Sequence, residues 1–363
     1  MRPRVTRVAV IGAGLTGLAA GWELRRAGAE TTLLEGDRRV GGVILTERPH
    51  GFVVEGGPDG FLAAEPEIPL LAGELGVAGR LVDQLTRGSS LWNGRQLEPL
   101  EEGRAAALLG IPEPAHADLR KGFRTFAGGM AEVIDALAKQ LGDAVQIGSP
   151  VATVAASRRG YRLTLPGTAE IEVDAIVLAL PAWEMARLLG GLGAPGGREL
   201  AEVPYAPSIT VSLAYRREQV PAQLEGTGFV SSPEWRGSVR ACTYASLKYP
   251  GRAPRGSLLL RAFLGSPSTS GDPATLAHDE LARMLGINGS PLWARVFTWP
   301  RGIPRYKAGH AERVAGLRAG MARLPPVGIA GAAVDGAGVS ACVRSGRQAA
   351  RAVLTRLSVP SPS

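Results

Sequence analysis

The residues of this sequence whose types and spacing could do chemistry lie close to its N-terminus. The six residues GAGLTG run from Gly12 to Gly17, and an acidic residue, Glu35, follows 18 positions later. Glycines at the start of a helix let a pyrophosphate rest against bare backbone N–H groups, and a carboxylate at this distance can accept both hydroxyls of a ribose. The spacing therefore predicts a dinucleotide site, and the acidic residue disfavours a 2′-phosphate.

This site needs a strand, a turn and a helix in succession. Residues 8–11 are small and apolar, which is typical of a parallel strand buried on both faces, and residues 31–34 form a second apolar run before the acidic residue. Gly12 permits the tight turn, Gly14 lets the phosphate approach, and Gly17 lets the helix lie close to the strand. The other residues of the predicted phosphate turn are Ala13, Leu15 and Thr16.

A second glycine pair follows the acidic residue. Gly41 and Gly42 begin six positions after Glu35, and Arg39 lies between them and the acid. An NAD site does not need this pair. In proteins that hold FAD in an extended form, a second glycine pair lets the chain pass close to the pyrophosphate, and an arginine offers charge. The pattern therefore favours FAD over NAD.

Two more glycine-rich turns are expected to bring backbone close to a flat ring. The first turn, residues 56–61, follows a short predicted strand at residues 52–55. The second turn lies between a buried strand at residues 327–331 and a helix at residues 339–357. Backbone N–H groups there can stabilise the charge of a reduced flavin. The candidates for this contact are Gly331, Gly338 and Val339.

The composition is that of an ordinary folded protein of about two domains, because 45% of its 363 residues are hydrophobic and 20% are charged. The net charge of +8 comes from arginine, since lysine occurs only at positions 121, 139, 248 and 307. This excess fits either a GC-rich coding bias or attraction of an anionic ligand or membrane surface. No dense basic run with interleaved aromatic residues occurs, so we expect no nucleic-acid partner and at most peripheral membrane contact.

Cysteine and histidine are too sparse to indicate a disulfide framework or a metal site. Cys242 and Cys342 are far apart, and the four histidines at positions 50, 116, 278 and 310 have no ligand spacing. The N-terminus lacks an apolar leader, and no apolar run of about 18 residues occurs. We therefore expect no metal and a cytoplasmic location. His310 is a candidate for bracing a loop near the flavin.

Other side chains leave two interpretations open. Trp299 and Tyr306 could line a pocket for a flat macrocycle, although aromatic residues at this spacing also occur in cores. Asp59 with Glu55 could suggest acid–base chemistry, but solvated loop charges are the simpler expectation, and the same holds for the acidic pair at positions 101 and 102.

The predicted fold class is α/β, with an FAD domain of the two-dinucleotide-binding type and a smaller α+β substrate domain. The FAD domain comprises residues 1–82, 123–200 and 310–363, and the substrate domain comprises residues 83–122 and 201–309. The first sheet is expected to be mostly parallel with an inserted antiparallel meander, and the second mainly antiparallel. The predicted meander strands are residues 145–151, 153–156, 161–165 and 169–173.

Further hydrophobic patterns predict the remaining elements. A core-facing helix is expected at residues 130–141, a hairpin around Asn93, and a buried strand at residues 174–180. Residues 99–120 form a connection without strong periodicity. The strands of the second domain are expected at residues 209–215, 228–231, 239–243 and 257–263, with a helix at residues 273–285.

With these pieces placed, the sequence resembles the protoporphyrinogen oxidase family, oxygen-dependent flavoenzymes of haem synthesis within the amine-oxidase-like FAD group. The resemblance runs through nearly the whole chain. It is carried by VAVIGAGLTGLAAGWEL, LLEGDRRVGGVI, EGGPDGFL, FRTFAGGMAEVIDAL, LKYPGRAPRGSLLLRAFLGS, IPRYKAGHAERVAGL and GIAGAAVDGAGVSACVRSGRQAA. The first two segments are shared by many FAD proteins, whereas YPGRAPRG, the IPRY segment and AVDGAGVSACVRSG are more specific.

The resemblance implies roles for individual positions. It implies that Gly36 and Val43 join the glycines, Glu35 and Arg39 in binding the ADP half of FAD, and that Val151 contacts the adenine through its backbone. It also implies that the flavin is contacted by Gly57, Pro58, Asp59 and Gly60. The positions that it implies for the pyrimidine edge of the flavin are Ala332, Ala337, Gly338 and Val339. The family chemistry is hydride transfer from a reduced tetrapyrrole to flavin N5, with O2 as acceptor and peroxide as product. This chemistry needs little from side chains and demands no general base, so no catalytic residue is assigned.

The sequence departs from the family pattern in two places. Family members carry roughly 100 more residues, a helical part that covers the substrate, where this chain has about 25 residues after Pro99. The family arginine that can grip a propionate falls on Ser89, with Arg87 two positions away. An FAD-dependent porphyrinogen oxidase is the leading hypothesis. An amine-oxidase-like or secondary-metabolite oxidoreductase, or a non-catalytic paralogue that binds FAD or a tetrapyrrole, are the alternatives.

Overall fold

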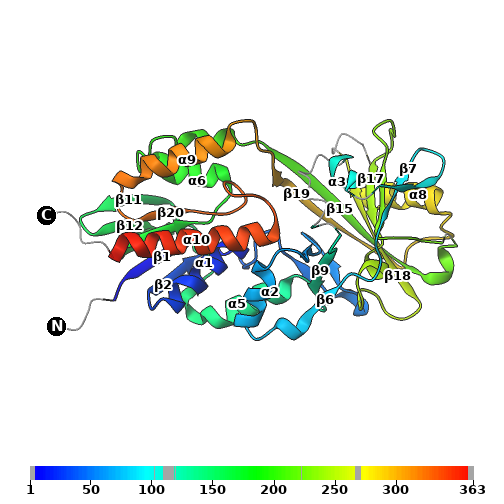
Figure 1. The fold of residues 1–363 in the computed structure, drawn as a ribbon, viewed down its shortest axis with the longest axis horizontal. Helices are drawn as coiled ribbons and strands as arrows, with labels where there is room; N and C mark the ends of the chain where they lie inside the picture. Colours follow the sequence, from blue (N-terminus) through cyan, green and yellow to red (C-terminus); the bar gives the residue numbers. More distant parts are fainter. Residues whose placement is uncertain are drawn as a thin grey trace.

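Two sheets at opposite ends of an elongated molecule organise the chain (Figure 1). The structure is a computed structural model that describes residues 5–101, 103–108, 118, 120–221, 223–265 and 271–358. A five-stranded parallel sheet defines the dinucleotide half, which carries both chain termini at its outer end. The other half of the molecule is organised by a seven-stranded sheet and is called the sheet half below.

The parallel sheet is formed by short apolar strands in the order β10-β2-β1-β14-β20. Its central strand is VAVI preceded by Arg7, and Val8 to Ile11 are all buried because both faces of the sheet are covered. Val8 pairs with Thr31 on one side and with Ala175 on the other. The strands are β1 (Arg7–Ile11), β2 (Glu30–Leu34), β10 (Val145–Gln146), β14 (Ala175–Leu178) and β20 (Val327–Ile329).

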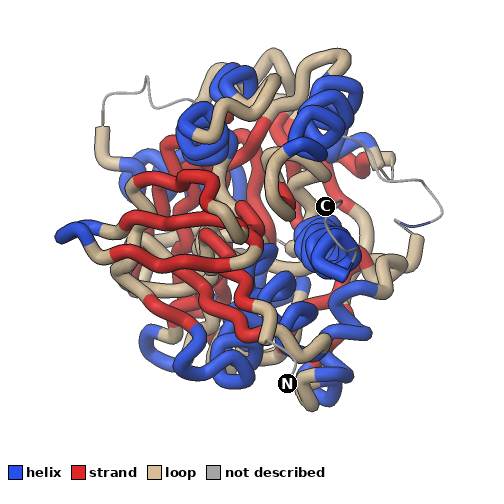
Figure 2. Tube along the Cα trace, turned by 90° about the vertical axis from the view of Figure 1, so that its left-hand side faces the viewer, coloured by secondary structure: helices blue, strands red, loops and turns tan. Residues whose placement is uncertain are grey.

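Helices and a meander cover the two faces of this sheet, as the end-on view in Figure 2 shows. One face packs on Leu18, Ile134 and Val343, and the other packs on Tyr161, Met185 and neighbours. The first group of elements is α1 (Leu15–Arg26), α2 (Glu67–Glu74), α5 (Ala131–Leu141) and α10 (Val339–Ser358). The second group is α6 (Ala182–Gly191), α9 (His310–Gly320), β11 (Thr153–Ser157), β12 (Gly160–Thr164) and β13 (Glu170–Val173).

Helices α1 and α10 approach each other closely. A Cβ on Gly346 of α10 would lie 2.2 Å from the carbonyl oxygen of Thr16, so only glycine allows this crossing. The contact places the N-terminal end of α10 beside the start of α1, at the end of the dinucleotide half that faces the sheet half (Figure 1). The N-termini of α1 and α10 are therefore both directed at the junction between the two halves.

The sheet half is built on the strand order β19-β15-β18-β17-β16-β7-β8. Its pairs are antiparallel except for β16 with β7. Helix α8 (Pro273–Leu285) begins at Asp272, whose carboxylate accepts the Thr275 N–H, and it covers one face of the sheet. The strands are β7 (Ser89–Trp92), β8 (Leu97–Leu100), β15 (Tyr205–Arg216), β16 (Gly228–Ser231), β17 (Val239–Thr243), β18 (Ser257–Leu264) and β19 (Trp293–Pro304).

Short elements complete the described chain. They are β3 (Thr46–Glu47), β4 (Val54–Glu55), β5 (Phe61–Leu62), β6 (Leu81–Asp83), β9 (Phe123–Phe126), α3 (Arg104–Leu108) and α7 (Ala245–Lys248). Strand β9 joins β5 and β6 into a separate three-stranded sheet. No helix in the described residues is long and apolar enough to cross a membrane.

Three sequence predictions of elements need correction. Residues 145–151 are not a meander strand, because Val145–Gln146 pairs with β2 and extends the parallel sheet. Strand β19 and helix α9 were not predicted, because β19 contains Pro300 and Gly302, and α9 carries two glycines. Strand β19 is an edge strand, where proline is tolerated. Part of the connection predicted at residues 99–120 forms α3, while residues 109–117 lie outside the described residues.

Candidate active site

The turn between β1 and α1 is built from contacts that only glycine allows. Gly12 has φ +100°, and a Cβ there would lie 2.4 Å from the carbonyl oxygen of Ala179. A Cβ on Gly17 would lie 1.8 Å from the carbonyl oxygen of Gly12, so α1 packs directly on the turn. Gly14 precedes α1 without a side-chain cap, which leaves the first N–H groups of the helix suited to an anion.

Gly14 differs from these two glycines because no contact among the described residues requires it. Its φ is −67°, and the nearest heavy atom to a Cβ there would be the Cα of Gly42, 4.0 Å away. Gly42 stands opposite with φ +58°, and Gly41 donates its N–H to the carbonyl of Ala13 at 2.8 Å. The two segments form a backbone cradle that a side chain would fill. This shape fits a pyrophosphate.

Glu35 lies at the end of β2 and is held by this turn. Its Oε2 accepts the N–H of Ala13 at 2.7 Å, and its Oε1 accepts the N–H of Asp37 at 2.9 Å. A carboxylate offers about four acceptor positions, so two remain for the hydroxyls of a ribose. The predicted acidic partner is therefore adjacent to the predicted phosphate turn and oriented by backbone donors.

Arg39 clamps the loop that carries the second glycine pair. Its guanidinium donates to the carbonyls of Val40 at 3.1 Å and Ile44 at 3.2 Å, and also to that of Gly42. The arginine thus fixes the backbone on the far side of the cradle. Of the other predicted residues in this loop, Val43 is exposed and Gly36 packs on Pro150.

The predicted flavin turn at Gly57–Gly60 is wedged between the two halves. A Cβ on Gly57 would lie 1.9 Å from the carbonyl oxygen of Val43, and a Cβ on Gly60 would lie 2.3 Å from Oη of Tyr249. Only bare backbone fits between these neighbours. Pro58 and Asp59 complete the turn, and the Asp59 carboxylate binds Lys248 Nζ at 2.9 and 3.1 Å.

Glu55 is buried and Asp59 is half-buried, and each forms an ion pair with a cation, so the expectation of solvated loop charges was wrong for them. Glu55 Oε1 lies 3.0 Å from Nη1 of Arg252, and both residues are at most 5% exposed. Burial raises the pKa of Glu55 above its ordinary value, and Arg252 opposes this rise. Burial alone would also raise the pKa of Asp59, but Lys248 and Arg261 outweigh it and hold that pKa below its ordinary value.

The sequence offered no local signal for these pairs, because each joins residues about 190 positions apart. The five residues Glu55, Asp59, Lys248, Arg252 and Arg261 are called the buried charge cluster below. The cluster connects the Gly57–Gly60 turn to the segment around α7 and to β18. It was missed by the sequence analysis, although it occupies the junction of the two halves.

The second predicted flavin turn joins β20 to α10. Gly331 has φ +109°, and its N–H donates to Ser345 Oγ at 2.8 Å, so this N–H is already used inside the protein. Ala337 and Gly338 are exposed, and Val339 is the first residue of α10. The helix N-terminus, rather than the Gly331 N–H, is therefore the part of this turn that is suited to a partial negative charge.

Trp299 and Tyr306 brace the two flavin turns. Trp299 Nε1 donates to the carbonyl of Gly56 at 2.7 Å, and Tyr306 Oη donates to the carbonyl of Ala332 at 2.5 Å. The ring of His310 stacks on Tyr306 with centroids 4.6 Å apart. Strand β19 and the residues after it therefore hold both turns, a role that the sequence analysis assigned only to His310.

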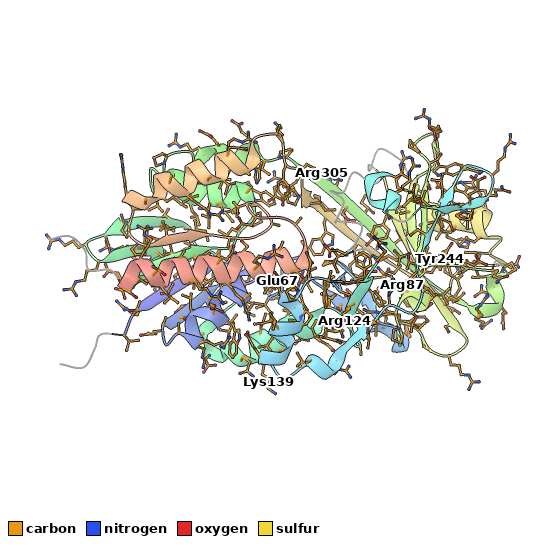
Figure 3. The ribbon with its side chains drawn as sticks, in the orientation of Figure 1. Glu67, Arg87, Arg124, Lys139, Tyr244 and Arg305 are labelled. Atoms are coloured by element: carbon orange, nitrogen blue, oxygen red, sulfur yellow. The ribbon has the colours of Figure 1, made fainter. Side chains whose placement is uncertain are left out.

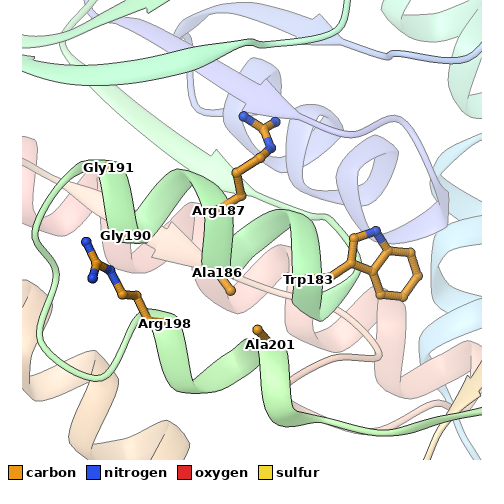
Figure 4. Close-up of a pocket in the computed structure, with 7 residues that line it drawn as sticks. All are labelled: Trp183, Ala186, Arg187, Gly190, Gly191, Arg198 and Ala201. Carbon is orange, nitrogen blue, oxygen red and sulfur yellow. The ribbon is translucent and has the colours of Figure 1, made fainter.

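The remaining predicted contacts lie further out. The Val151 carbonyl accepts a hydrogen bond from Arg187 Nη2 at 2.9 Å. Arg187 also lines a surface cavity of about 450 Å³ beside α6, together with Trp183 and Arg198 (Figure 4). Arg87 is exposed and donates to the carbonyl of Arg120, in the region between β9 and the seven-stranded sheet (Figure 3).

Comparison with known proteins places this geometry in a family. Residues 88–354 match the family Flavin containing amine oxidoreductase, and residues 10–74 match NAD(P)-binding Rossmann-like domain. Coproporphyrinogen III oxidase of Bacillus subtilis is 25% identical over 466 residues, with 96% of this chain and 98% of that protein covered. Coproporphyrinogen III oxidase of Mycobacterium tuberculosis is 27% identical over 452 residues, covering 96% and 97% of the two chains.

Solved structures agree on the fold. A protein from Exiguobacterium provisionally assigned as a protoporphyrinogen oxidase superposes with a TM-score of 0.83 at 22% identity, over 98% of this chain and 100% of that one. Cyclohexylamine oxidase from Brevibacterium oxydans superposes with a TM-score of 0.78 at 15% identity, with the same coverage.

These findings confirm the α/β fold class, the resemblance to the porphyrinogen oxidases and a flavin as cofactor. The match to the first family extends over well more than half of the chain, and it includes Trp299 and Tyr306. The chain belongs to the family of flavin-containing amine oxidoreductases.

Proposed function

We propose that this protein binds FAD and dehydrogenates a porphyrinogen to a porphyrin in haem synthesis, with O2 as electron acceptor. The observation that carries the proposal is the similarity to coproporphyrinogen III oxidases along 96% of the chain. Each pair of electrons and protons removed from the macrocycle reduces one O2 to one hydrogen peroxide. Coproporphyrinogen III and protoporphyrinogen IX are the two candidate substrates.

The residues of the β1–α1 turn fit the ADP part of FAD. The uncapped N-terminus of α1 and the cradle of Gly14 and Gly42 suit the pyrophosphate, and Glu35 retains acceptors for the ribose. The Val151 segment is assigned to the adenine. These assignments explain why Gly14 is glycine although no internal contact requires it.

The second flavin turn fits the pyrimidine edge of the ring. A bound flavin would supply the hydride acceptor, and its reduced form would carry negative charge along its pyrimidine edge. The N-terminus of α10, with Ala337, Gly338 and Val339, is directed toward the junction where this edge would lie and favours such charge. Tyr306 fixes the preceding Ala332 carbonyl, so the turn is held in place before the ring binds.

In this proposal, one half of the molecule binds FAD and the other half binds the substrate. Residues 1–82, 123–200 and 310–363 form the FAD domain, and residues 83–122 and 201–309 form the substrate domain. The alignment with the Bacillus subtilis relative spans 466 positions and covers 96% of this 363-residue chain, so about 120 positions have no counterpart in it. We assign the difference to the substrate cover after Pro99, and we expect a cytoplasmic protein that remains in the supernatant when membranes are pelleted.

The purified protein tests the cofactor first. We expect it to be yellow, with an FAD absorption spectrum that dithionite bleaches, and we expect heat to release FAD rather than FMN. A colourless protein that takes up no added FAD would contradict the proposal at its base.

Anaerobically prepared porphyrinogens test the reaction. On admission of air, coproporphyrinogen III or protoporphyrinogen IX should yield porphyrin fluorescence together with peroxide, above the rate of a control without enzyme. Turnover of an amine and of neither porphyrinogen would favour the amine-oxidase alternative. FAD binding without turnover of either class would favour the non-catalytic alternative.

A further inference from the structure

One face of the seven-stranded sheet is turned toward the dinucleotide half and carries a buried arginine. Directly opposed residues on antiparallel strands share a face, so Arg261 of β18 lies on the same face as Ser212 of β15 and Thr243 of β17. On that face, Phe297 of β19 would touch a Cβ placed on Gly56. Arg261 therefore faces the turn that is predicted to contact the flavin.

The buried charge cluster contains three cations and two anions. Glu55 pairs with Arg252, and both oxygens of Asp59 bind Lys248. Arg261 is only 5% exposed and forms no ion pair within 4 Å among the described residues. Arg261 thus interacts with Asp59 and Glu55 only beyond ion-pair distance, and it is the one cation of the cluster without a direct carboxylate partner.

The hydrogen bonds of Arg261 are also incomplete. Its Nε is buried without a partner in the described structure, and its Nη2 lies 3.4 Å from Thr210 Oγ1, which is a weak contact. Tyr249 Oη is a second buried donor without a partner, and it lies where a Cβ on Gly60 would fall. Buried polar groups in proteins are nearly always satisfied, so the unpartnered Nε of Arg261 and Oη of Tyr249 leave two donors available to an acceptor from outside the described residues.

We propose that Arg261 binds a carboxylate of the substrate, on the sheet face opposite the flavin turn. This inference rests on the proposed function, because porphyrinogens carry propionate side chains. The planar guanidinium matches a carboxylate in shape and charge, and such a pair would neutralise the third cation. Arg87, the arginine that the sequence suggested for this role, is exposed and engaged with the Arg120 carbonyl.

Binding of the stable product gives a readout that does not need turnover. Coproporphyrin III and its tetramethyl ester can be titrated by fluorescence into FAD-loaded wild type, Arg261→Met and Arg261→Lys. We expect Arg261→Met to weaken coproporphyrin III binding about 10- to 100-fold, which is the range for a lost hydrogen-bonded charge partner. Ester binding should change little, and Arg261→Lys should restore part of the affinity for the acid.

Unfolding of the same variants tests whether Arg261 is instead a structural residue. Because Arg261 has no carboxylate within ion-pair distance among the described residues, we expect Arg261→Met to unfold at about the same denaturant concentration as wild type. Arg252→Met is the matched variant, since it removes the partner of Glu55, and we expect it to unfold much earlier.

Several outcomes would overturn the assignment of Arg261. Equal loss of acid and ester binding, unchanged acid binding, or destabilisation as large as that of Arg252→Met would each contradict it. If wild type turns over a porphyrinogen while Arg261→Met keeps its KM, this inference fails and the proposed function stands. If wild type binds coproporphyrin III through Arg261 without any turnover, the proposed function fails instead.

Discussion

The phosphate turn and the buried charge cluster adjoin the same candidate cofactor site but are built in opposite ways. The phosphate turn is made of backbone, and its glycines Gly12, Gly14, Gly17, Gly41 and Gly42 lie within about 30 positions of each other. The charge cluster is made of side chains that lie about 190 positions apart in each ion pair. A backbone turn built from residues close in sequence can be predicted from the spacing of those residues. Ion pairs between residues far apart in the sequence can be identified only from the fold.

The largest stability effect is expected in the charge cluster. Glu55→Gln removes the counter-ion of Arg252 and leaves a buried guanidinium without a partner, so we expect a loss of about 3–5 kcal/mol in the free energy of unfolding. Chemical denaturation of the FAD-free protein measures it. The matched control is Glu172→Gln at an exposed pair with Arg162, where the loss should stay under about 1 kcal/mol. Equal losses at the two sites would remove the distinction between buried and exposed charge.

The next effect belongs to the phosphate turn. Gly17→Ala would place a Cβ 1.8 Å from the Gly12 carbonyl oxygen, so α1 must move away from β1. We expect a loss of about 1–3 kcal/mol from this overpacking, measured by the same denaturation. Gly316→Ala in α9 is the control, because no heavy atom lies within 4 Å of its Cβ, and alanine there should be neutral or stabilising. A neutral Gly17→Ala would show that close packing of α1 is not needed.

The comparison also explains how much could be predicted from the sequence. The positions of the parallel strands β1, β2, β14 and β20, the β7–β8 hairpin and the helices α5, α8 and α10 follow from local periodicity and turn residues. The β1–α1 turn and the position of Glu35 beside it also follow from spacing, while their binding of a pyrophosphate and a ribose stays a prediction. The Val145 segment was placed in the wrong sheet, because a two-residue strand pairs only through its tertiary neighbour β2.

Side-chain roles were harder to predict than elements. Trp299 and Tyr306 were predicted to line a pocket or to lie in a core, and the structure adds that both donate hydrogen bonds to backbone carbonyls, those of Gly56 and Ala332. Strand β19, which holds Trp299, lacks a clear alternating pattern and is fixed by its pairing with β15. Arg261 lies in an apolar strand and was not singled out, because only the fold shows that its Nε is buried without a hydrogen-bond partner.

A third substitution separates cofactor binding from stability. Gly14→Ala places a methyl group in the cradle, where its nearest neighbour is 4.0 Å away, so the FAD-free protein should be as stable as wild type. The methyl occupies the space assigned to the pyrophosphate, and we expect FAD affinity to fall at least about 10-fold, equivalent to about 1.4 kcal/mol. Titration of the FAD-free protein with FAD measures this change, with Gly316→Ala as the control. Unchanged affinity would place the pyrophosphate elsewhere.

The smallest effect concerns a carboxylate outside both regions. Glu74 of α2 accepts hydrogen bonds from Arg347 at 2.5 Å and from Trp22 Nε1 at 2.9 Å. Burial acts to raise its pKa, but these two donors and Arg26 outweigh burial and hold the pKa below its ordinary value of 4.5. A depressed carboxyl pKa contributes stability that is present above the unfolded pKa and is lost as pH falls through the folded pKa.

Glu74→Gln should therefore destabilise the protein at pH 7 by under about 1 kcal/mol, because water screens this partly exposed group. The difference from wild type should shrink as the pH is lowered from about 5 through the depressed pKa, since wild-type Glu74 then becomes neutral as well. Urea denaturation of both proteins at neutral and acidic pH measures this convergence. A difference that stayed constant across this pH range would mean that the neutral Trp22 hydrogen bond, not charge, carries the contribution of Glu74. In that case, charge would contribute to the stability of this fold mainly where it is buried, as it is around Glu55.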